Sequence, residues 1–423
     1  MEKQKSFTNL RSLLNALARA MNLINPDMEN HHEQTAYLAY LIARELKFSE
    51  RDVERTICAS LLHDIGSIMF EKQCTVAEIE HNAETIAKLG AAMLRDVELM
   101  GTIADIIEHC QSSWSECTDH TTGQCYVGAR IASVIHLADT VSLIVQKTQP
   151  ILNQAKKICD VIEQGKGTEF SEESVEAFLR LSKYEFIWFD LVYNPSFLLE
   201  FFTGDIRPLS LEQTVEITKV MSRIIDYRSS FTAMHSAGVA ASAVTLARLS
   251  GMDEEDCMKM WIAGYLHDVG KLKVPSSILE KPGKLTDEEF NVIKEHPYNT
   301  RLILMGVDGF EQIANWAGFH HEKLNGRGYP FHYDRSQLDE EAKMMAVADI
   351  FSALTEERPY RAGMKKELVY KIMKENVASE AICGHIVDLL FDHYEEVDEI
   401  RYTVSREAGN RYFDSLEGGA MAG

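Results

Sequence analysis

The sequence predicts an all-α fold made of two helical domains in tandem. Most segments repeat apolar residues at positions i, i+3, i+4 and i+7, which is the period of one helix face, and none alternates clearly with period 2. Only nine prolines interrupt the 423 residues. At roughly 150 residues per domain, a chain of this length is expected to form two or three domains.

The helical period is clear at 36–46, 239–249 and 367–377. Turn-forming residues interrupt it at Pro150, 165–167 and 204–208. The last break precedes a helix-start signal, because Ser210 stands before an apolar run and is followed closely by Glu212 and Gln213. We therefore expect domains at 1–205 and 206–405, and a tail at 406–423.

The two halves resemble each other, which indicates an internal duplication. At an offset of 204 residues, His31 matches His235 and the pair His63-Asp64 matches His267-Asp268. Farther on, Ala138-Asp139 matches Ala348-Asp349 at an offset of 210. Histidine and aspartate thus recur in the same order in both halves.

Charge and composition exclude several classes of protein. Asp and Glu number 65 against 43 Lys and Arg, a net charge of −22, so the chain is a poor candidate for binding duplex nucleic acid. No run approaches the roughly 20 apolar residues of a membrane span, and the first residues lack the apolar core of a signal peptide. Eight cysteines are too sparse for a disulfide scaffold. We expect a reduced, cytoplasmic protein without a membrane span.

The second half concentrates side chains that bind metals. They are His235, His267, Asp268, His296, His320, His321 and Asp349. Imidazole and carboxylate without thiolate suit Fe, Mn, Ni or Zn and argue against a structural zinc finger. Seven ligands exceed what one ion takes while it keeps an open position, whereas two ions that share a carboxylate would use them all. Asp268 is the natural bridge because it directly follows a ligand histidine.

Each of these residues also has a simpler interpretation. A single histidine on a helix is usually a surface residue or a hydrogen-bonded core residue, and Asp349 could form a buried ion pair with an arginine. The adjacent pairs His267-Asp268 and His320-His321 favour metal binding, because both lie in apolar surroundings where unpaired polar groups are costly. Paired ions about 3.5–4 Å apart suit the hydrolysis of phosphate esters.

The segments HDVGK, HHEKLNGRGYP and RPYR, in this order over about residues 210–400, resemble the HD-GYP family of cyclic-dinucleotide phosphodiesterases. The resemblance implies an all-helical HD-type fold and a centre of two or three metals, often iron or manganese. It also implies a reaction that linearises cyclic di-GMP or, in some members, 3′,3′-cyclic GMP-AMP.

Transferred residue by residue, the resemblance assigns His235, His267, Asp268 and Asp349 to the first metal. It assigns Asp268, His296, His320 and His321 to the second. Asp268 and Lys271 would be catalytic, and Lys271 would also neutralise the scissile phosphate. Arg358 and Arg361 would hold phosphates through their guanidinium groups, although simple solvation at the surface is the alternative.

Two positions depart from the family pattern. Members with three metals have a glutamate four residues before the first histidine, where this chain has Phe231, so a two-metal centre is favoured. The loop motif begins with Asn325 instead of aspartate, and asparagine still supports a turn. Gly326 and Gly328 would allow close approach of the backbone. Gly328 and Tyr329 would contact substrate, although a structural role for Tyr329 is an equal alternative.

The first half retains His31, His63, Asp64, His81, His109 and Asp139. Ser67 replaces the catalytic lysine, Cys110 replaces the second histidine of the pair, and no GYP loop or RPYR segment follows. We expect a degenerate HD-like domain, with or without a metal, that regulates, senses a ligand or mediates contact with a second copy or another protein.

The leading hypothesis is therefore a metal-dependent phosphodiesterase acting on a cyclic dinucleotide in bacterial second-messenger signalling. One alternative is an HD-type phosphohydrolase of linear nucleotides, and another is a receptor that binds the dinucleotide without cleaving it. Two divalent ions are expected, Fe or Mn before Ni or Zn, and a partner could bind through the first domain or the GYP loop.

Overall fold

The computed structural model describes residues 6–24, 28, 30–69, 81–95, 97–117, 128–146, 148–193, 202, 204–226, 234–281, 283–356 and 363–420, with the backbone alone for 411–420. These residues form helices and one short pairing of β1 (Thr8–Asn9) with β2 (Pro208–Leu209). The predicted all-α class is confirmed. None of the described helices combines the length and the apolar character needed to span a membrane.

The chain divides into two compact units, Asn9–Arg207 and Pro208–Gly423, and the described residues before Asn9 group with the second. The amide of Phe7 donates to the carbonyl of Leu209, which explains this grouping. Helix α23 (Tyr394–Ala420) continues across the position where the sequence suggested that a tail begins.

The first unit packs its core around three helices, α2, α3 and α8. In chain order its helices are α1 (Leu10–Asn22), α2 (His31–Glu45), α3 (Glu50–Leu62), η2 (Ile65–Met69), α5 (Ala83–Arg95), η3 (Glu98–Met100), α6 (Gly101–Glu108), α7 (Trp114–Cys117), α8 (Ala129–Ile144), α9 (Ile151–Gln164), α10 (Glu172–Leu181) and α11 (Glu185–Tyr193).

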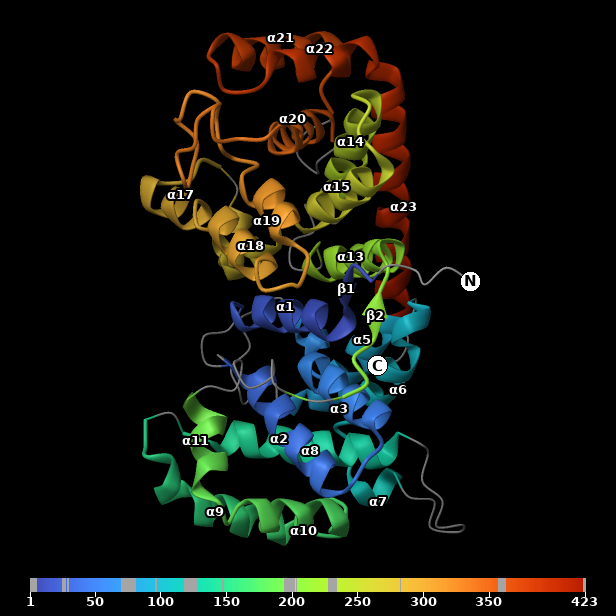
Figure 1. Ribbon diagram of the computed structural model, residues 1–423, viewed down its shortest axis with the longest axis vertical. Helices are drawn as coiled ribbons and strands as arrows, with labels where there is room; N and C mark the ends of the chain where they lie inside the picture. The colour runs from blue at the N-terminus through green and yellow to red at the C-terminus, as the bar shows by residue number, and fades with distance from the viewer. Residues whose placement is uncertain are drawn as a thin grey trace. The chain divides into compact units, whose positions relative to one another are not determined.

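The second unit places α14 at its centre, where it contacts α15, α20 and α23 (Figure 1). Its helices are α13 (Leu211–Asp226), α14 (His235–Leu249), α15 (Glu254–Leu266), η4 (Val269–Lys273), α16 (Ser276–Leu279), α17 (Asp287–Ile293), α18 (His296–Leu304), α19 (Glu311–Gly318), α20 (Glu340–Thr355), α21 (Lys366–Ala378), α22 (Gly384–Asp392) and α23. Every residue of α14 from His235 to Ala247 is buried, and small or apolar side chains therefore predominate on all of its faces.

Polar side chains cap the first turns of two helices in the second unit. Ser210 accepts a hydrogen bond from the amide of Gln213 at 3.3 Å, and the side chain of Gln213 accepts one from the amide of Ser210 at 3.0 Å. This reciprocal pair confirms the helix start predicted there. Asp253 caps α15 by accepting from Asp256, and the acidic first turn of that helix complements its dipole.

Candidate metal centre and active site

The seven candidate ligands of the second unit come together from five helices or their ends. His235 begins α14, His267 ends α15, His296 begins α18, and Asp349 lies within α20. Asp268 and the pair His320-His321 occupy the connections that directly follow α15 and α19. All but His321 are buried, so the core of the unit carries a polar cluster that needs partners.

One group of donors consists of His235, His267 and Asp268. Nε2 of His267 lies 3.3 Å from Oδ2 of Asp268. Asp349 adjoins this group, since its Oδ1 lies 3.2 Å from Nε2 of His235.

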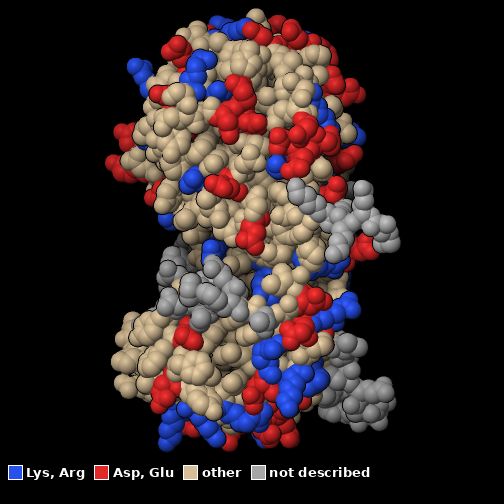
Figure 2. Space-filling model, viewed as in Figure 1, with Lys and Arg blue, Asp and Glu red and all other residues tan. Residues whose placement is uncertain are grey.

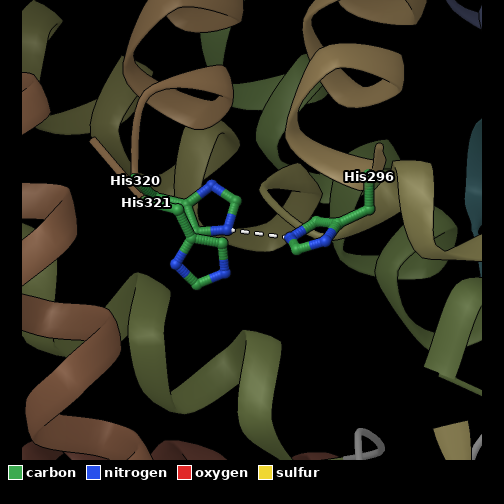
Figure 3. Close-up of side chains that lie close together, drawn as sticks. All are labelled: His296, His320 and His321. Carbon is green, nitrogen blue, oxygen red and sulfur yellow. Dashed lines mark hydrogen bonds between the residues drawn. The ribbon is translucent and has the colours of Figure 1, made fainter. Parts of the chain in front are cut away.

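A second group consists of His296, His320 and His321. Figure 3 shows the three rings turned toward one another, with Nε2 of His296 3.2 Å from Nε2 of His320. The side chain of His321 is 28 % exposed, and its Nδ1 lies 3.9 Å from Oδ2 of Asp349. Through His321, this second group of donors is therefore partly accessible to solvent.

Asp268 lies between the two groups. Its Oδ2 faces His267, whereas its Oδ1 lies 3.4 Å from Nε2 of His296 and 3.8 Å from Nε2 of His320. Each carboxylate oxygen thus faces a different set of imidazoles. A side chain with this geometry can serve two cations at once.

The donor atoms fit divalent metal ions. Within the described part of the chain, Nε2 of His267 and Oδ1 of Asp268 are buried atoms without a hydrogen-bond partner. The opposite ring nitrogens of His267, His296 and His320 lie 2.6–2.8 Å from the carbonyl three residues earlier. A carbonyl can only accept, so each Nδ1 carries the proton and each Nε2 directs a lone pair into the cluster.

Protonation states within the cluster follow from burial and charge. Burial, together with the neighbouring His267, lowers the pKa of His320 to about 4. Burial disfavours ionisation of Asp268, but His267 and Lys271 outweigh it and hold the pKa of the carboxyl well below its usual range. A neutral imidazole and an ionised carboxylate are the forms that bind metals.

Lys271 points back at the cluster from η4. Its Nζ lies 2.6 Å from Oδ2 of Asp268, and its side chain is 25 % exposed. The lysine expected to neutralise a phosphate therefore lies at the solvent-facing edge of the donor groups.

Thr300 is a positioning residue that the sequence analysis did not identify. Its hydroxyl donates to the carbonyl of His267 at 2.8 Å and accepts from the amide of Gly270 at 3.0 Å. A Cβ on Gly270 would lie 2.1 Å from the carbonyl oxygen of His296, so glycine is required for this approach. These contacts hold the segment with His267 and Asp268 against α18.

Glu356, at the end of α20, is a second residue that sequence reasoning missed. Its Oε2 lies 3.3 Å from Nδ1 of His235, and its side chain is only 6 % exposed. His235 thus has a carboxylate beside its Nδ1, where His267, His296 and His320 each have a carbonyl group. Burial alone would lower the pKa of His235, but Asp349 and Glu356 raise it to about 10.

The GYP loop is held by Glu322, which also went unnoticed in the sequence. Its two carboxylate oxygens accept from the amides of Phe331 at 2.7 Å and Tyr333 at 3.0 Å. A Cβ on Gly328 would lie 2.4 Å from Cα of Glu322, so Gly328 allows the loop to pass close to this residue. Its position directly after the histidine pair was the available signal.

Tyr329 lies beside the cluster, since its ring centroid is 4.9 Å from that of His321. The loop thus places an aromatic ring next to the partly exposed ligand. Three positions discussed in the sequence, Phe231, Arg358 and Arg361, lie outside the described residues.

The first unit repeats only part of this arrangement. His31, His63 and Asp64 form a buried donor group, and Asp139 adjoins it at 3.2 Å from both histidines. His81 is exposed and outside this donor group. His109 is partly exposed, with its Nδ1 3.0 Å from the carbonyl of Asp105. The sequence pattern therefore overstated the ligand set of this half.

Comparison with known proteins agrees with this description. The HD domain model matches residues 28–163, and a second HD domain model matches residues 219–382. The chain is 30 % identical to the 3′3′-cGAMP-specific phosphodiesterase 1 of Vibrio cholerae, over 91 % of this chain and 90 % of that protein. It is also 30 % identical to the 3′3′-cGAMP-specific phosphodiesterase 3 of the same organism, over 74 % of this chain and 69 % of the other.

A solved structure has the same fold. A crystal structure of a cyclic GMP-AMP specific phosphodiesterase of V. cholerae superimposes with a TM-score of 0.64 at 22 % identity, over 92 % of this chain and 98 % of that one. The similarity along nearly the whole chain, two HD domains and the clustered motifs of the second unit lead to one conclusion. The chain belongs to the HD-GYP family of cyclic-dinucleotide phosphodiesterases, with a degenerate HD domain before the HD-GYP domain.

Proposed function

We propose that this protein is a metal-dependent phosphodiesterase that hydrolyses one 3′,5′-phosphodiester of a cyclic dinucleotide to the linear dinucleotide. The substrate is 3′,3′-cyclic GMP-AMP, cyclic di-GMP or both. The observation that carries the proposal is the placement of Asp268, with one oxygen toward each group of imidazoles. The names of the two relatives that match 91 % and 74 % of the chain support the substrate class.

We assign two divalent ions to the second unit, Fe or Mn before Ni or Zn. One ion would take His235, His267, Asp268 and Asp349, and the other would take Asp268, His296, His320 and His321. When bound, such ions polarise a phosphodiester and lower the pKa of a nearby water molecule.

The residues of the chain would bind and orient the substrate. Hydrolysis joins a water oxygen to phosphorus and breaks one phosphorus–oxygen bond, and the departing ribose oxygen takes a proton. Lys271 presents an ammonium group at the edge of the cluster, where it would offset the charge that develops on the phosphate. Gly328 and Tyr329 would form one wall of the substrate site, and Arg358 and Arg361 would hold phosphate oxygens.

We assign catalysis to the domain at 206–405 and regulation to the domain at 1–205. A second copy of the chain or another protein would bind to the first domain or to the GYP loop. The cysteines of the described residues are all free thiols, which supports a reducing, cytoplasmic setting.

Product analysis tests the function directly. Protein loaded with Mn²⁺ or Fe²⁺ is incubated with cyclic di-GMP, 3′,3′-cyclic GMP-AMP, cyclic di-AMP and linear nucleotides, and the products are identified by mass spectrometry. A linear dinucleotide from the first or second substrate supports the proposal, and Asp268→Ala should abolish it. Binding without turnover would instead identify a receptor, and cleavage of linear nucleotides alone would identify a phosphohydrolase.

Lys271 offers a matched pair of variants. Lys271→Met should lower kcat strongly while metal content stays unchanged, and Lys271→Arg should retain part of the activity because it keeps the charge. Equal activity in the methionine variant would remove Lys271 from the proposed mechanism.

A further inference from the structure

A glutamate, a cysteine and a histidine lie together in the second unit, apart from the seven candidate ligands. Glu340 is the first residue of α20, Cys383 is the N-cap of α22, and His385 lies in the first turn of α22. One donor atom of each residue lies within 4.8 Å of the other two. Glu340 precedes Asp349 by nine residues on the same helix, about 13 Å along its axis, so this trio is separate from the metal cluster.

The distances within the trio are close to those of a tetrahedral zinc site. Sγ of Cys383 lies 3.2 Å from Nδ1 and 3.8 Å from Nε2 of His385. Nε2 of His385 lies 3.0 Å from Oε2 of Glu340. Zinc bonds of about 2.3 Å to sulfur and about 2.0 Å to nitrogen or oxygen place sulfur about 3.5 Å from nitrogen, and nitrogen about 3.3 Å from oxygen. A small rotation of the His385 ring would bring its donor atom to both separations.

Charge and exposure allow an ion to enter the trio. The side chains of Glu340 and His385 are 49 % and 67 % exposed, whereas Cys383 is only 2 % exposed, so the sulfur lies beneath a ring that is free to move outward. Oε1 of Glu340 is paired with Lys343 at 3.0 Å, which leaves Oε2 facing the trio. A carboxylate and a thiolate together balance the charge of one divalent cation.

The backbone fixes both sides of the trio. The carbonyl of Cys383 accepts a hydrogen bond from the amide of Val387 at 3.1 Å, which closes the first turn of α22. Asp339 caps α20 by accepting from the amide of Ala342 at 2.9 Å. Helices α20 and α22 contact each other (Figure 1). An ion held by the trio would therefore join the starts of two neighbouring helices.

Sulfur distinguishes the trio from the other donor groups. Among the groups of three or more metal-binding side chains in the described residues, it is the one that contains a cysteine. Thiolate is a soft ligand that selects Zn²⁺, whereas Mn²⁺ prefers oxygen ligands. The trio thus favours a different metal from the imidazole and carboxylate cluster of the same unit.

We propose that Glu340, Cys383 and His385 bind one divalent ion of the zinc class through a carboxylate oxygen, a thiolate and an imidazole nitrogen, with a water molecule in the fourth position. On binding, the S–H bond of Cys383 breaks, its proton passes to solvent and a metal–sulfur bond forms. The ion stabilises the contact between α20 and α22. This site does not depend on the proposed phosphodiesterase activity.

Charge transfer from thiolate to metal tests the proposal without any measurement of activity. Co²⁺ added to the metal-free, full-length protein should produce a near-ultraviolet sulfur-to-cobalt band, which nitrogen and oxygen ligands do not give, and Zn²⁺ should remove it by displacing Co²⁺. Cys383→Ser should lack the band. Cys257→Ser, which changes another buried cysteine, is the matched control and should keep it.

A second pair of variants tests the histidine. His385→Ala, at an exposed position, should shift the titration of the band to higher Co²⁺ concentration. His393→Ala is the matched control, because His393 is the C-cap of the same helix and pairs with Glu396 at 3.5 Å. It should leave the titration unchanged.

Zinc content per chain gives an independent measurement. After loading with Zn²⁺ and desalting, Cys383→Ser should contain one zinc fewer than the wild type. Absence of the charge-transfer band in the wild type would show that the trio is a hydrogen-bonded group only and would overturn the proposal. A band that survives Cys383→Ser would place the ion at another cysteine and would overturn it equally.

Discussion

Glu356 shows how a residue outside every motif can control a ligand. Its carboxylate lies 3.3 Å from Nδ1 of His235, on the side of the ring opposite the metal cluster. The negative charge of a carboxylate this close to the ring increases the basicity of His235. Asp349 contacts the other nitrogen of the same ring, so His235 is held between two carboxylates.

We expect Glu356→Gln to weaken metal binding by the second unit about 10–100-fold, because an amide keeps the shape of the side chain but loses its charge. Isothermal titration calorimetry with the metal ion measures the change in affinity. Glu367→Gln, at an exposed position of α21, is the matched control and should bind metal as the wild type does. Unchanged affinity in Glu356→Gln would show that the carboxylate is only a packing group.

At the scale of elements, the site depends on how η4 meets α18. The hydroxyl of Thr300 connects the carbonyl of His267 with the amide of Gly270, so a single side chain serves one acceptor and one donor of the neighbouring segment. Both backbone groups are buried, and removal of the hydroxyl would leave both of them without this partner.

Thr300→Val should therefore lower the free energy of unfolding by about 1–3 kcal/mol, since valine keeps the volume and leaves the buried groups unpaired. Thr300→Ser, which retains the hydroxyl, should lose much less. Denaturant unfolding of both metal-free variants measures the difference. Equal stability of the two variants would mean that the hydroxyl contributes nothing.

In the first unit, a buried ion pair joins α1 to α3. Arg11 pairs with Glu54, and both residues are at most 7 % exposed. Arg11 also donates to the carbonyl of Phe202 at 2.7 Å, which attaches a third segment.

Arg11→Ala should destabilise the protein by about 3–5 kcal/mol, because it leaves a buried carboxylate without its partner. The double variant Arg11→Met/Glu54→Leu removes both charges and should recover most of that loss. Thermal and denaturant unfolding report the two values. A double variant as unstable as Arg11→Ala would assign the effect to packing instead of charge.

At the scale of the whole molecule, the net charge of −22 limits which partners approach. Figure 2 shows basic side chains interspersed with acidic ones on the visible face of each unit, without a continuous basic stripe. The cationic character needed for an anionic substrate must then be local, and it would come from the bound ions and Lys271.

Duplex DNA should consequently bind more weakly than about 10⁻⁴ M at physiological salt, the weak end of non-specific protein–DNA affinities. Fluorescence anisotropy with a labelled duplex measures this, and a labelled basic DNA-binding domain serves as the positive control. Tight, salt-sensitive binding would reveal a basic surface that the overall charge conceals.

The sequence by itself determined the helical class and the set of candidate ligands in the second unit. Helical periodicity follows from the backbone alone, and buried His-Asp and His-His pairs are costly unless they have partners. The segments around these residues also carried the family resemblance, because it depends only on the motifs and on their order along the chain.

Only the tertiary structure decided how the two halves correspond. The offset between them is 204 residues at Gly66 and Gly270, but 210 at Ile86 and His296, whose carbonyl groups approach these two glycines in the same way, so histidines that seemed equivalent in the sequence are not. Connections between helices differ in length in the two halves, so the residue offset changes along the chain. Only the packing of the helices shows which residue of each half faces the cluster of donor side chains. For the same reason Thr300 and Glu356 could be identified only when distant segments were brought together.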